Sequence, residues 1–305
     1  MSLIIEKNQI KGWLAGLKKN FIIIETKKMV LPAKQYFFPP KEDIFIFNKI
    51  SGKLSVPEKR EKLLLVCSHL GELEAMTQLD EIMKTPRPDW YYWQKRDQSV
   101  LVGIVDQSVE AASGGDLILE KINKEQYRAL ILTAQGKKLI KKDFFKEIEK
   151  PKIKKYLPES KPLKELLLDP ELLSEAVAWS WQTKHKIWDE LGKKCLGCGI
   201  CTYVCPICHC FSIEDRVDLD GEKCVRCRQW DACTLPRFAQ VAGGHNFHKS
   251  IKERYYNWFY HKFVRAYKEY GRTQCVACGQ CARYCPAGIS IEKVLLEIVG
   301  DYKKK

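Results

Sequence analysis

Eight of the cysteines in this 305-residue chain stand at regular spacings in its second half. They form two copies of one pattern, Cys-x2-Cys-x2-Cys-x3-Cys-Pro, at residues 195–206 and 275–286. Thiolates at this spacing can wrap a short loop around three corners of an iron–sulfur cubane, and the Cys-Pro step completes a pattern typical of [4Fe-4S] binding. The two copies therefore predict two [4Fe-4S] clusters.

The fourth cysteine of each run is expected to bind the other cluster and to begin a helix. In two-cluster ferredoxins it crosses to the neighbouring cubane, which brings the clusters close enough to pass an electron. Gly199 and Gly279 occupy the same place in both runs, where the loop needs unusual dihedrals or a close approach. One cluster is then assigned to Cys195, Cys198, Cys201 and Cys285, and the other to Cys275, Cys278, Cys281 and Cys205.

Structural zinc is the alternative for these eight cysteines. Zinc ribbons use paired Cys-x2-Cys knuckles that supply four tetrahedral ligands. They lack the third cysteine at the same step and the Cys-Pro ending, both of which occur twice here. The pattern therefore favours iron–sulfur clusters.

Five further cysteines lie between the two runs and leave two interpretations open. Four of them could hold a third iron–sulfur cluster or a zinc ion, with His209 as an additional ligand. Free cysteines are also common as small buried apolar groups. His245 and His248 are expected to pack or to form hydrogen bonds near a cluster. The five cysteines are Cys208, Cys210, Cys224, Cys227 and Cys233.

The first half of the chain is expected to form a mixed α/β scaffold domain over residues 1–150. Short apolar runs bounded by polar residues or proline predict strands at 21–24, 44–47, 63–66 and 100–105. Apolar residues spaced by about three predict a helix over 70–82, and residues 124–138 are expected to be helical as well. Cys67 is expected to lie in this core. No nucleotide or flavin motif and no catalytic residue is found.

The second half is predicted to be a mainly helical cluster domain over 163–305, with a long insertion at 206–274. A linker is expected at 148–162, followed by one helix from the cap Asp169 to Gly192. Aromatic residues at helical spacing over 249–270 are expected to pack in the core and keep water from a cluster. A short helix from Ile291 is expected to end at Gly300. The predicted fold class is α+β.

The composition narrows the kinds of function that the chain is expected to have. The formal net charge is +14. We interpret it first as a solvated basic surface and second as a feature that suits an acidic partner. The start of the chain does not resemble a signal peptide, no apolar run is long enough to span a bilayer, and cysteines without an export signal indicate metal binding. We therefore expect a cytoplasmic protein. A zinc-stabilised nucleic-acid binder is the alternative from another class, and an enzyme with an unusual cluster on the middle cysteines is a third hypothesis.

Three short segments carry a family resemblance: CPICHCF at 205–211, WDAC at 230–233 and GGHN at 243–246. Here the chain resembles the β subunit of soluble [NiFe] hydrogenases of the sulfhydrogenase type, and the related first subunit of anaerobic sulfite reductases. The first half resembles them weakly, at 71–80 and 115–117. It has Gly71-Glu72-Leu73 where the family often has Cys-Asp-Leu, and Cys224 and Cys227 are not expected from the family.

The resemblance implies an electron-transfer subunit that makes no bonds itself. Its partners would be a flavin-containing NAD(P)H- or ferredoxin-linked subunit and the small and large hydrogenase subunits. The alternative is the equivalent iron–sulfur subunit of a sulfite reductase or another dehydrogenase complex. Neither nucleic-acid binding nor membrane insertion is expected.

Overall fold

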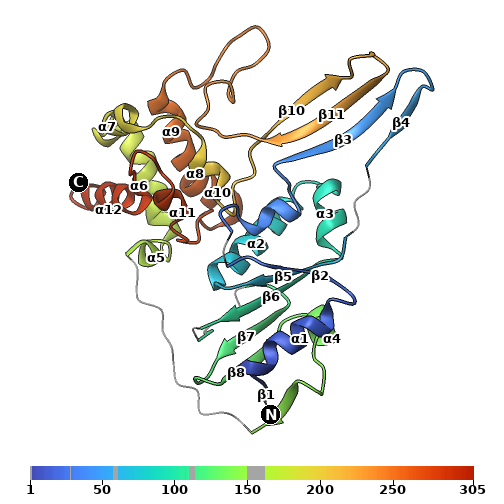
Figure 1. Ribbon diagram of the computed structural model, residues 1–305. Helices are drawn as coiled ribbons and strands as arrows, with labels where there is room; N and C mark the ends of the chain where they lie inside the picture. Colours follow the sequence, from blue (N-terminus) through green and yellow to red (C-terminus); the bar gives the residue numbers. More distant parts are fainter. Residues whose placement is uncertain (1, 28, 58–60, 107, 110–113, 150–161) are drawn as a thin grey trace. The chain divides into compact units, whose positions relative to one another are not determined.

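The computed structural model describes residues 2–27, 29–57, 61–106, 108–109, 114–149 and 162–305. The predicted linker at 148–162 lies almost wholly outside the described residues. Two compact units form within the chain. The first contains residues 1–38 and 58–159, and the second contains residues 39–57 and 160–305. Helices and strands occur in both units, so the fold class is α+β, as predicted (Figure 1).

The first unit is built on a seven-stranded sheet with the order β2-β5-β6-β7-β8-β1-β9. Strands β2, β5, β6 and β7 run parallel, and β8, β1 and β9 continue the sheet antiparallel. All five residues of β5 are buried, which is typical of a central parallel strand with both faces covered. The strands are β1 (Ser2–Glu6), β2 (Ile22–Glu25), β5 (Leu63–Cys67), β6 (Val100–Val105), β7 (Leu117–Lys121), β8 (Gln126–Ile131) and β9 (Phe145–Ile148).

The described residues of the first unit also form four α-helices and two 3-10 turns. The predicted strands near 21–24, 63–66 and 100–105 and the predicted helix over 70–82 are confirmed. Cys67 is fully buried at the end of β5, as expected. The helices are α1 (Ile10–Leu17), α2 (Leu70–Ile82), α3 (Trp90–Arg96) and α4 (Ala134–Lys138), with 3-10 turns η1 (Lys7–Gln9) and η2 (Ala33–Tyr36).

The helix predicted over 124–138 is wrong. Residues Gln126–Ile131 form β8, which makes a hairpin with β7, and only Ala134–Lys138 is helical. The turn is fixed by Asn123, whose side-chain oxygen accepts the Glu125 amide at 2.9 Å and whose nitrogen donates to Gln126 at 2.9 Å. Such local side-chain bonds stabilise turns at the expense of helix, and this signal was missed.

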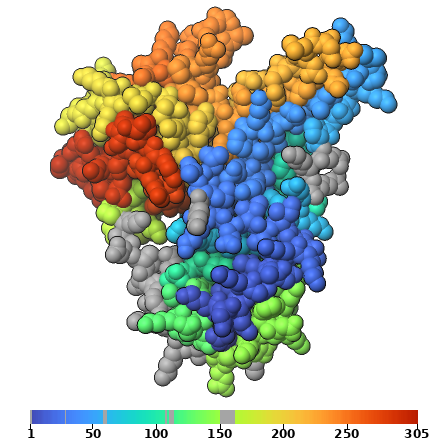
Figure 2. Space-filling view, viewed as in Figure 1, coloured from blue at the N-terminus to red at the C-terminus, as the bar shows by residue number. Residues whose placement is uncertain are grey.

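The second unit contains a four-stranded antiparallel sheet with the order β10-β11-β3-β4. The strand predicted around 44–47 exists as part of β3, but it pairs with β11 from the second half of the chain instead of joining the first sheet. Buried Arg228 on β11 forms an ion pair with Glu42 on β3, which ties the segment 39–57 to the second unit. Figure 2 shows the surface of the β10–β11 and β3–β4 pairs. Their bounds are β3 (Lys41–Asn48), β4 (Lys53–Ser55), β10 (Phe211–Val217) and β11 (Lys223–Trp230).

The remainder of the second unit is helical. Its core gathers buried aromatic rings, including Trp188, Tyr255, Trp258 and Phe259, so the expected packing role of the aromatic-rich segment is confirmed. That segment is one continuous helix in which η3 is a π-helical turn. The helices are α5 (Pro162–Leu166), α6 (Pro170–Gln182), α7 (Ile187–Lys194), α8 (Ile200–Tyr203), α9 (Ile251–Phe259), η3 (Tyr260–Arg265), α10 (Ala266–Tyr270), α11 (Gln280–Arg283) and α12 (Ile291–Tyr302).

The single helix predicted over 169–192 is two helices. Asp169 caps α6 as expected, because its carboxylate accepts the Leu172 amide at 2.9 Å. The chain breaks at Lys184, whose φ of 55° is left-handed. The break brings Trp188 of α7 back onto α6, where its indole nitrogen donates to the Ser180 hydroxyl at 3.1 Å.

The two glycines predicted to end helices do not do so. Gly192 lies inside α7, where a β-carbon would stand 3.0 Å from Cβ of Lys252, so its role is close packing. Helix α12 continues through Gly300 to Tyr302. Gly192 is in close contact with Lys252, whereas Gly300 has open space around it and the helix continues to Tyr302, whose ring packs on Trp179 of α6.

Candidate iron–sulfur centre

The two cysteine loops repeat one backbone conformation. Gly197 and Gly199 have φ of 63° and 78°, and Ala277 and Gly279 at the equivalent positions have φ of 51° and 73°. L-residues avoid this left-handed region, so a shared pair of such positions indicates one shared loop fold. A one-turn helix follows each loop, α8 in the first run and α11 in the second, and these two helices lie in contact.

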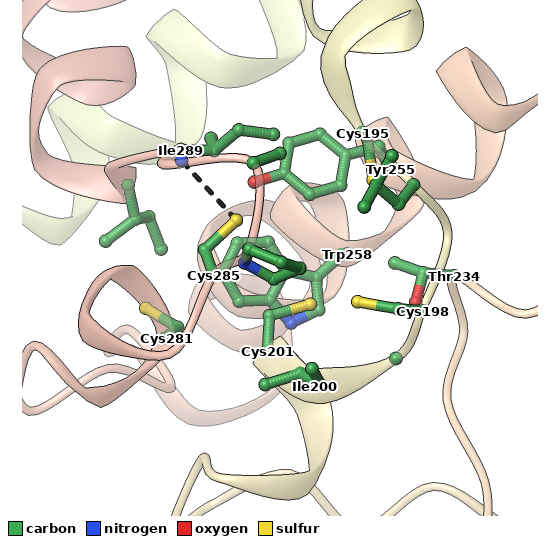
Figure 3. A pocket seen from close by; sticks show the side chains of 15 residues that line it. Cys195, Cys198, Ile200, Cys201, Thr234, Tyr255, Trp258, Cys281, Cys285 and Ile289 are labelled. Atoms are coloured by element: carbon green, nitrogen blue, oxygen red, sulfur yellow. Dashed lines mark hydrogen bonds between the residues drawn. The ribbon is translucent and has the colours of Figure 1, made fainter.

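The first loop lines a cavity that opens to solvent, together with cysteines of the second run; its empty space, including the open mouth, is about 450 Å³. Figure 3 shows the side chains of Cys198 and Cys201 extending toward one another across this space. Tyr255 and Trp258 of α9 form an apolar wall. The cysteines that line the cavity are Cys195, Cys198, Cys201, Cys281 and Cys285.

The second loop lines another cavity, whose empty space, including its open mouth, is about 360 Å³. It too combines three cysteines of one run with the fourth cysteine of the other. Cys281, Trp258 and Ile291 line both cavities, so the two spaces adjoin. The cysteines of the second cavity are Cys205, Cys275, Cys278 and Cys281.

The fourth cysteines do not begin helices, contrary to expectation. Cys205 follows α8 and Cys285 follows α11, and the next helix after Cys285 starts only at Ile291. Backbone amides lie near sulfur both after Cys285 and within the first loop. The Ile289 amide donates to Sγ of Cys285 at 3.4 Å, and the Gly197 amide donates to Sγ of Cys195 at 3.4 Å. Such bonds stabilise a thiolate.

Burial makes the bare thiols hard to ionise. It raises the pKa of the Cys201 thiol to about 12 and that of the Cys275 thiol to about 11. Because a metal binds the thiolate, loading these sites must release protons and must compensate the burial of charge. Both cavities therefore suit a positively charged iron core better than they suit empty thiols.

A buried lysine stands at the second cavity. Lys262, in the π-turn η3, donates to Sγ of Cys205 and to the Gln274 carbonyl oxygen, both at 3.1 Å. Burial disfavours its charged form, but the charges of Cys205, Cys208 and Cys275 outweigh burial and hold the pKa of Lys262 well above its usual value. Sequence reasoning missed this residue. Its one signal is the four-residue spacing from Trp258, which is weak because lysine on a helix is usually exposed.

The five middle cysteines do not lie in one place. Cys224 and Cys227 are on β11, opposite Val217 and Glu214 of β10. Cys210 hydrogen-bonds with Cys233, while Cys208 hydrogen-bonds with Cys205 at the second cavity. A third metal site remains a prediction, and only Cys208, Cys210 and Cys233 are near the cluster loops.

The cavities suit a multi-iron core. Among the side chains that the structure describes, no group of three or more His, Cys, Asp or Glu is arranged to share a single metal ion. The motif cysteines instead surround open spaces, as the ligands of a four-iron cubane must. His245 lies on the surface against Phe247, and neither His245 nor His248 lines either cavity.

Comparison with known proteins agrees with this geometry. The 4Fe-4S dicluster domain family matches residues 194–289. Over 291 residues the chain is 27% identical to sulfhydrogenase 2 subunit beta of Pyrococcus furiosus, with 90% of this chain and 85% of the relative covered. The chain is a relative of the iron–sulfur β subunits of hydrogenases.

The segments 205–211, 230–233 and 243–246, on which the sequence resemblance rests, lie inside the matched domain. No solved structure matches the chain. None of the described helices combines the length and apolar character that crossing a bilayer requires.

Proposed function

We propose that this chain relays single electrons through two [4Fe-4S] clusters and has no catalytic site of its own. Cys195, Cys198, Cys201 and Cys285 hold one cluster, and Cys275, Cys278, Cys281 and Cys205 hold the other. The observation that carries the proposal is the pair of adjoining cavities, each lined by three cysteines of one run and by the fourth cysteine of the other, with Cys281 lining both.

The residues around the cavities suit this role. A bound [4Fe-4S] cluster supplies reversible one-electron transfer. The loops fix the sulfur positions, and the amides of Gly197 and Ile289 stabilise the thiolates. Tyr255 and Trp258, each at most 5% exposed, keep water out of the cavity that they line. A dry, rigid surrounding keeps the structural change on electron uptake small.

The proposed neighbours are two redox subunits. One is a flavin-containing subunit that is linked to NAD(P)H or ferredoxin, and the other is the catalytic module of a hydrogenase. Support comes from the relative, whose name identifies it as the β subunit of a sulfhydrogenase. We propose that the protein is located in the cytoplasm.

The test is anaerobic purification of the full chain, followed by counts of iron and acid-labile sulfide. We expect about eight irons and about eight sulfides per chain, and a spectrum that bleaches with dithionite. A count near twelve irons would add a third cluster on the middle cysteines. Folded, colourless protein without iron would end the proposal.

Matched variants locate the clusters. Cys275→Ala removes a thiol of the second cavity and is expected to halve the iron content. Cys224→Ala removes a cysteine from β11, and Cys67→Ala removes one from the first unit. Both controls should keep the iron content of the unchanged protein.

A further inference from the structure

Lys262 is held in place on three sides. Its Nζ donates to Cys205 and to the Gln274 carbonyl, as described above, and it lies 5.4 Å from the centre of the Trp258 ring. Its own carbonyl oxygen accepts the Gln274 amide at 2.8 Å. Lys262 therefore joins the fourth cysteine of the first run to the residue that precedes Cys275. A lysine bound in this way keeps its ammonium against sulfur instead of extending to solvent.

The π-turn is what makes this position possible. A π-turn adds one residue to a helical turn and frees a carbonyl from the regular ladder, and such turns are frequent at functional sites. Here the turn buries Lys262 among apolar neighbours, with only 4% of its surface exposed. Burying an ammonium is costly unless it is paired. The thiolate of Cys205 and the electron-rich ring of Trp258 provide the compensation.

The first cavity is arranged differently. Arg254 is the cation that acts on Cys195, but its guanidinium donates to the backbone carbonyls of Thr234, His248 and Lys249. The thiols there receive amide hydrogen bonds from Gly197 and Ile289, as those of the second cavity do from Ala277 and Gln280. A full positive charge in direct contact with sulfur is thus a feature of the second cavity.

We propose that Lys262 is a positioning residue that raises the reduction potential of the cluster in the second cavity above that of its neighbour. The inference rests on the proposed function. Each cluster takes up one electron without gaining a proton or forming a bond, so reduction adds one negative charge. A fixed ammonium at a ligand sulfur stabilises that added charge, and low surrounding polarity strengthens the effect. Electrons entering the pair therefore settle on the second cluster.

The test is a dithionite titration followed by electron paramagnetic resonance, with iron counts on each sample. Lys262→Met should lower one of the two midpoint potentials by at least about 59 mV, which is a tenfold change in the one-electron equilibrium, and should shift the other by clearly less. Lys262→Arg keeps the charge and should keep most of the separation. Lys252→Met is the matched control, because Lys252 lies in the same helical segment and pairs with Asp189 at 2.7 Å on the surface. It should shift neither midpoint.

The affected signal must be that of the second cavity. It should be the same signal that Cys205→Ser perturbs. If Lys262→Met loses iron, Lys262→Gln decides, because it retains a donor without the charge. Equal shifts of both clusters, no shift with full iron, or loss of four irons in both neutral variants would each overturn the role of Lys262. Iron-free unchanged protein would instead overturn the proposed function.

Discussion

The two cysteine runs have the same backbone but different surroundings. Both loops turn through two left-handed residues into one turn of helix. Backbone amides donate to sulfur in both cavities, but the first cavity has Tyr255 at its wall, whereas the second has the Lys262 ammonium. The ligand spacing determines what kind of cofactor fits. The charge and burial around it, which determine its potential, come from the helix inserted between the runs.

The cysteine ligands are arranged symmetrically about the two cavities, but the charged side chains around them are not. The cysteines cross between the runs, so the two cavities depend on each other for binding. The lysine donates directly to a sulfur of the second cavity, and its charge reaches Cys201 of the first cavity only from a greater distance. Cluster loss should therefore follow the crossed pairing, and changes in potential should follow the local surroundings.

The largest expected effect is the loss of a whole cluster from the opposite run. Cys285→Ala should remove or convert the cluster of the first loop, although Cys285 belongs to the second run. Cys205→Ala should do the same to the cluster of the second loop. Iron counts and electron paramagnetic resonance of the remaining cluster check this. Loss confined to the run that carries the substitution would contradict the crossed assignment.

The next effect should fall on both cavities at once. Trp258, 2% exposed, lines both of them and packs edge-on against Phe259. Trp258→Ala leaves a large void and should lower the free energy of unfolding by about 3–5 kcal/mol. It should also speed the loss of both clusters in air. Urea unfolding and timed bleaching measure these changes.

Trp90→Ala is the control for this prediction. Trp90 belongs to the first unit and is 48% exposed, so its loss should change stability little. Faster bleaching of one cluster alone in Trp258→Ala would mean that the cavities do not share this wall.

A ligand pattern can be proposed from the sequence because cluster binding depends on local spacing. Each loop carries its own cysteines and its own turn residues, so the pattern can be recognised without knowledge of the rest of the fold. The same holds for buried strand β5 and for Asp169, whose capping role needs only its neighbours in the chain.

What sequence did not predict depends on distant partners. The strand at 41–48 was found, but its pairing with β11 across most of the chain was not. The break at Lys184 and the burial of Lys262 arise from packing against other helices. A helical pattern shows which residues share a face, but it does not show which charged residue the partner will bury.

Acid should weaken the π-turn beside the second cavity. Burial is the main cause that lowers the pKa of His261 from 6.5 to about 4. Because unfolded His261 takes up a proton before the folded residue does, the stability present above pH 6.5 is lost as the pH falls toward 4. The loss should be at most about 3 kcal/mol.

A neutral replacement provides the check. His261→Gln should flatten the pH dependence of the unfolding free energy between pH 6.5 and 4, measured by urea titration. His185→Gln is the matched control, because His185 lies outside the π-turn and pairs with Asp301 at 3.2 Å. A variant of His261 with an unchanged pH profile would mean that this histidine is not neutral in the fold.

The smallest effect tests the shared loop backbone. Gly197→Ala places a side chain at a left-handed position, and the nearest atom to its β-carbon is the Thr234 carbonyl oxygen at 3.5 Å. Space is therefore adequate, and only backbone strain remains, at about 1–2 kcal/mol.

Ala277→Gly makes the reverse change at the equivalent position of the second run. Relief of that strain should offset the lost methyl burial of about 0.8 kcal/mol, so stability should change by less than about 1 kcal/mol. Comparing the unfolding free energies of the two variants measures the strain added in the first run and the strain relieved in the second. An equal loss of stability in both would mean that the two loops do not share one conformation.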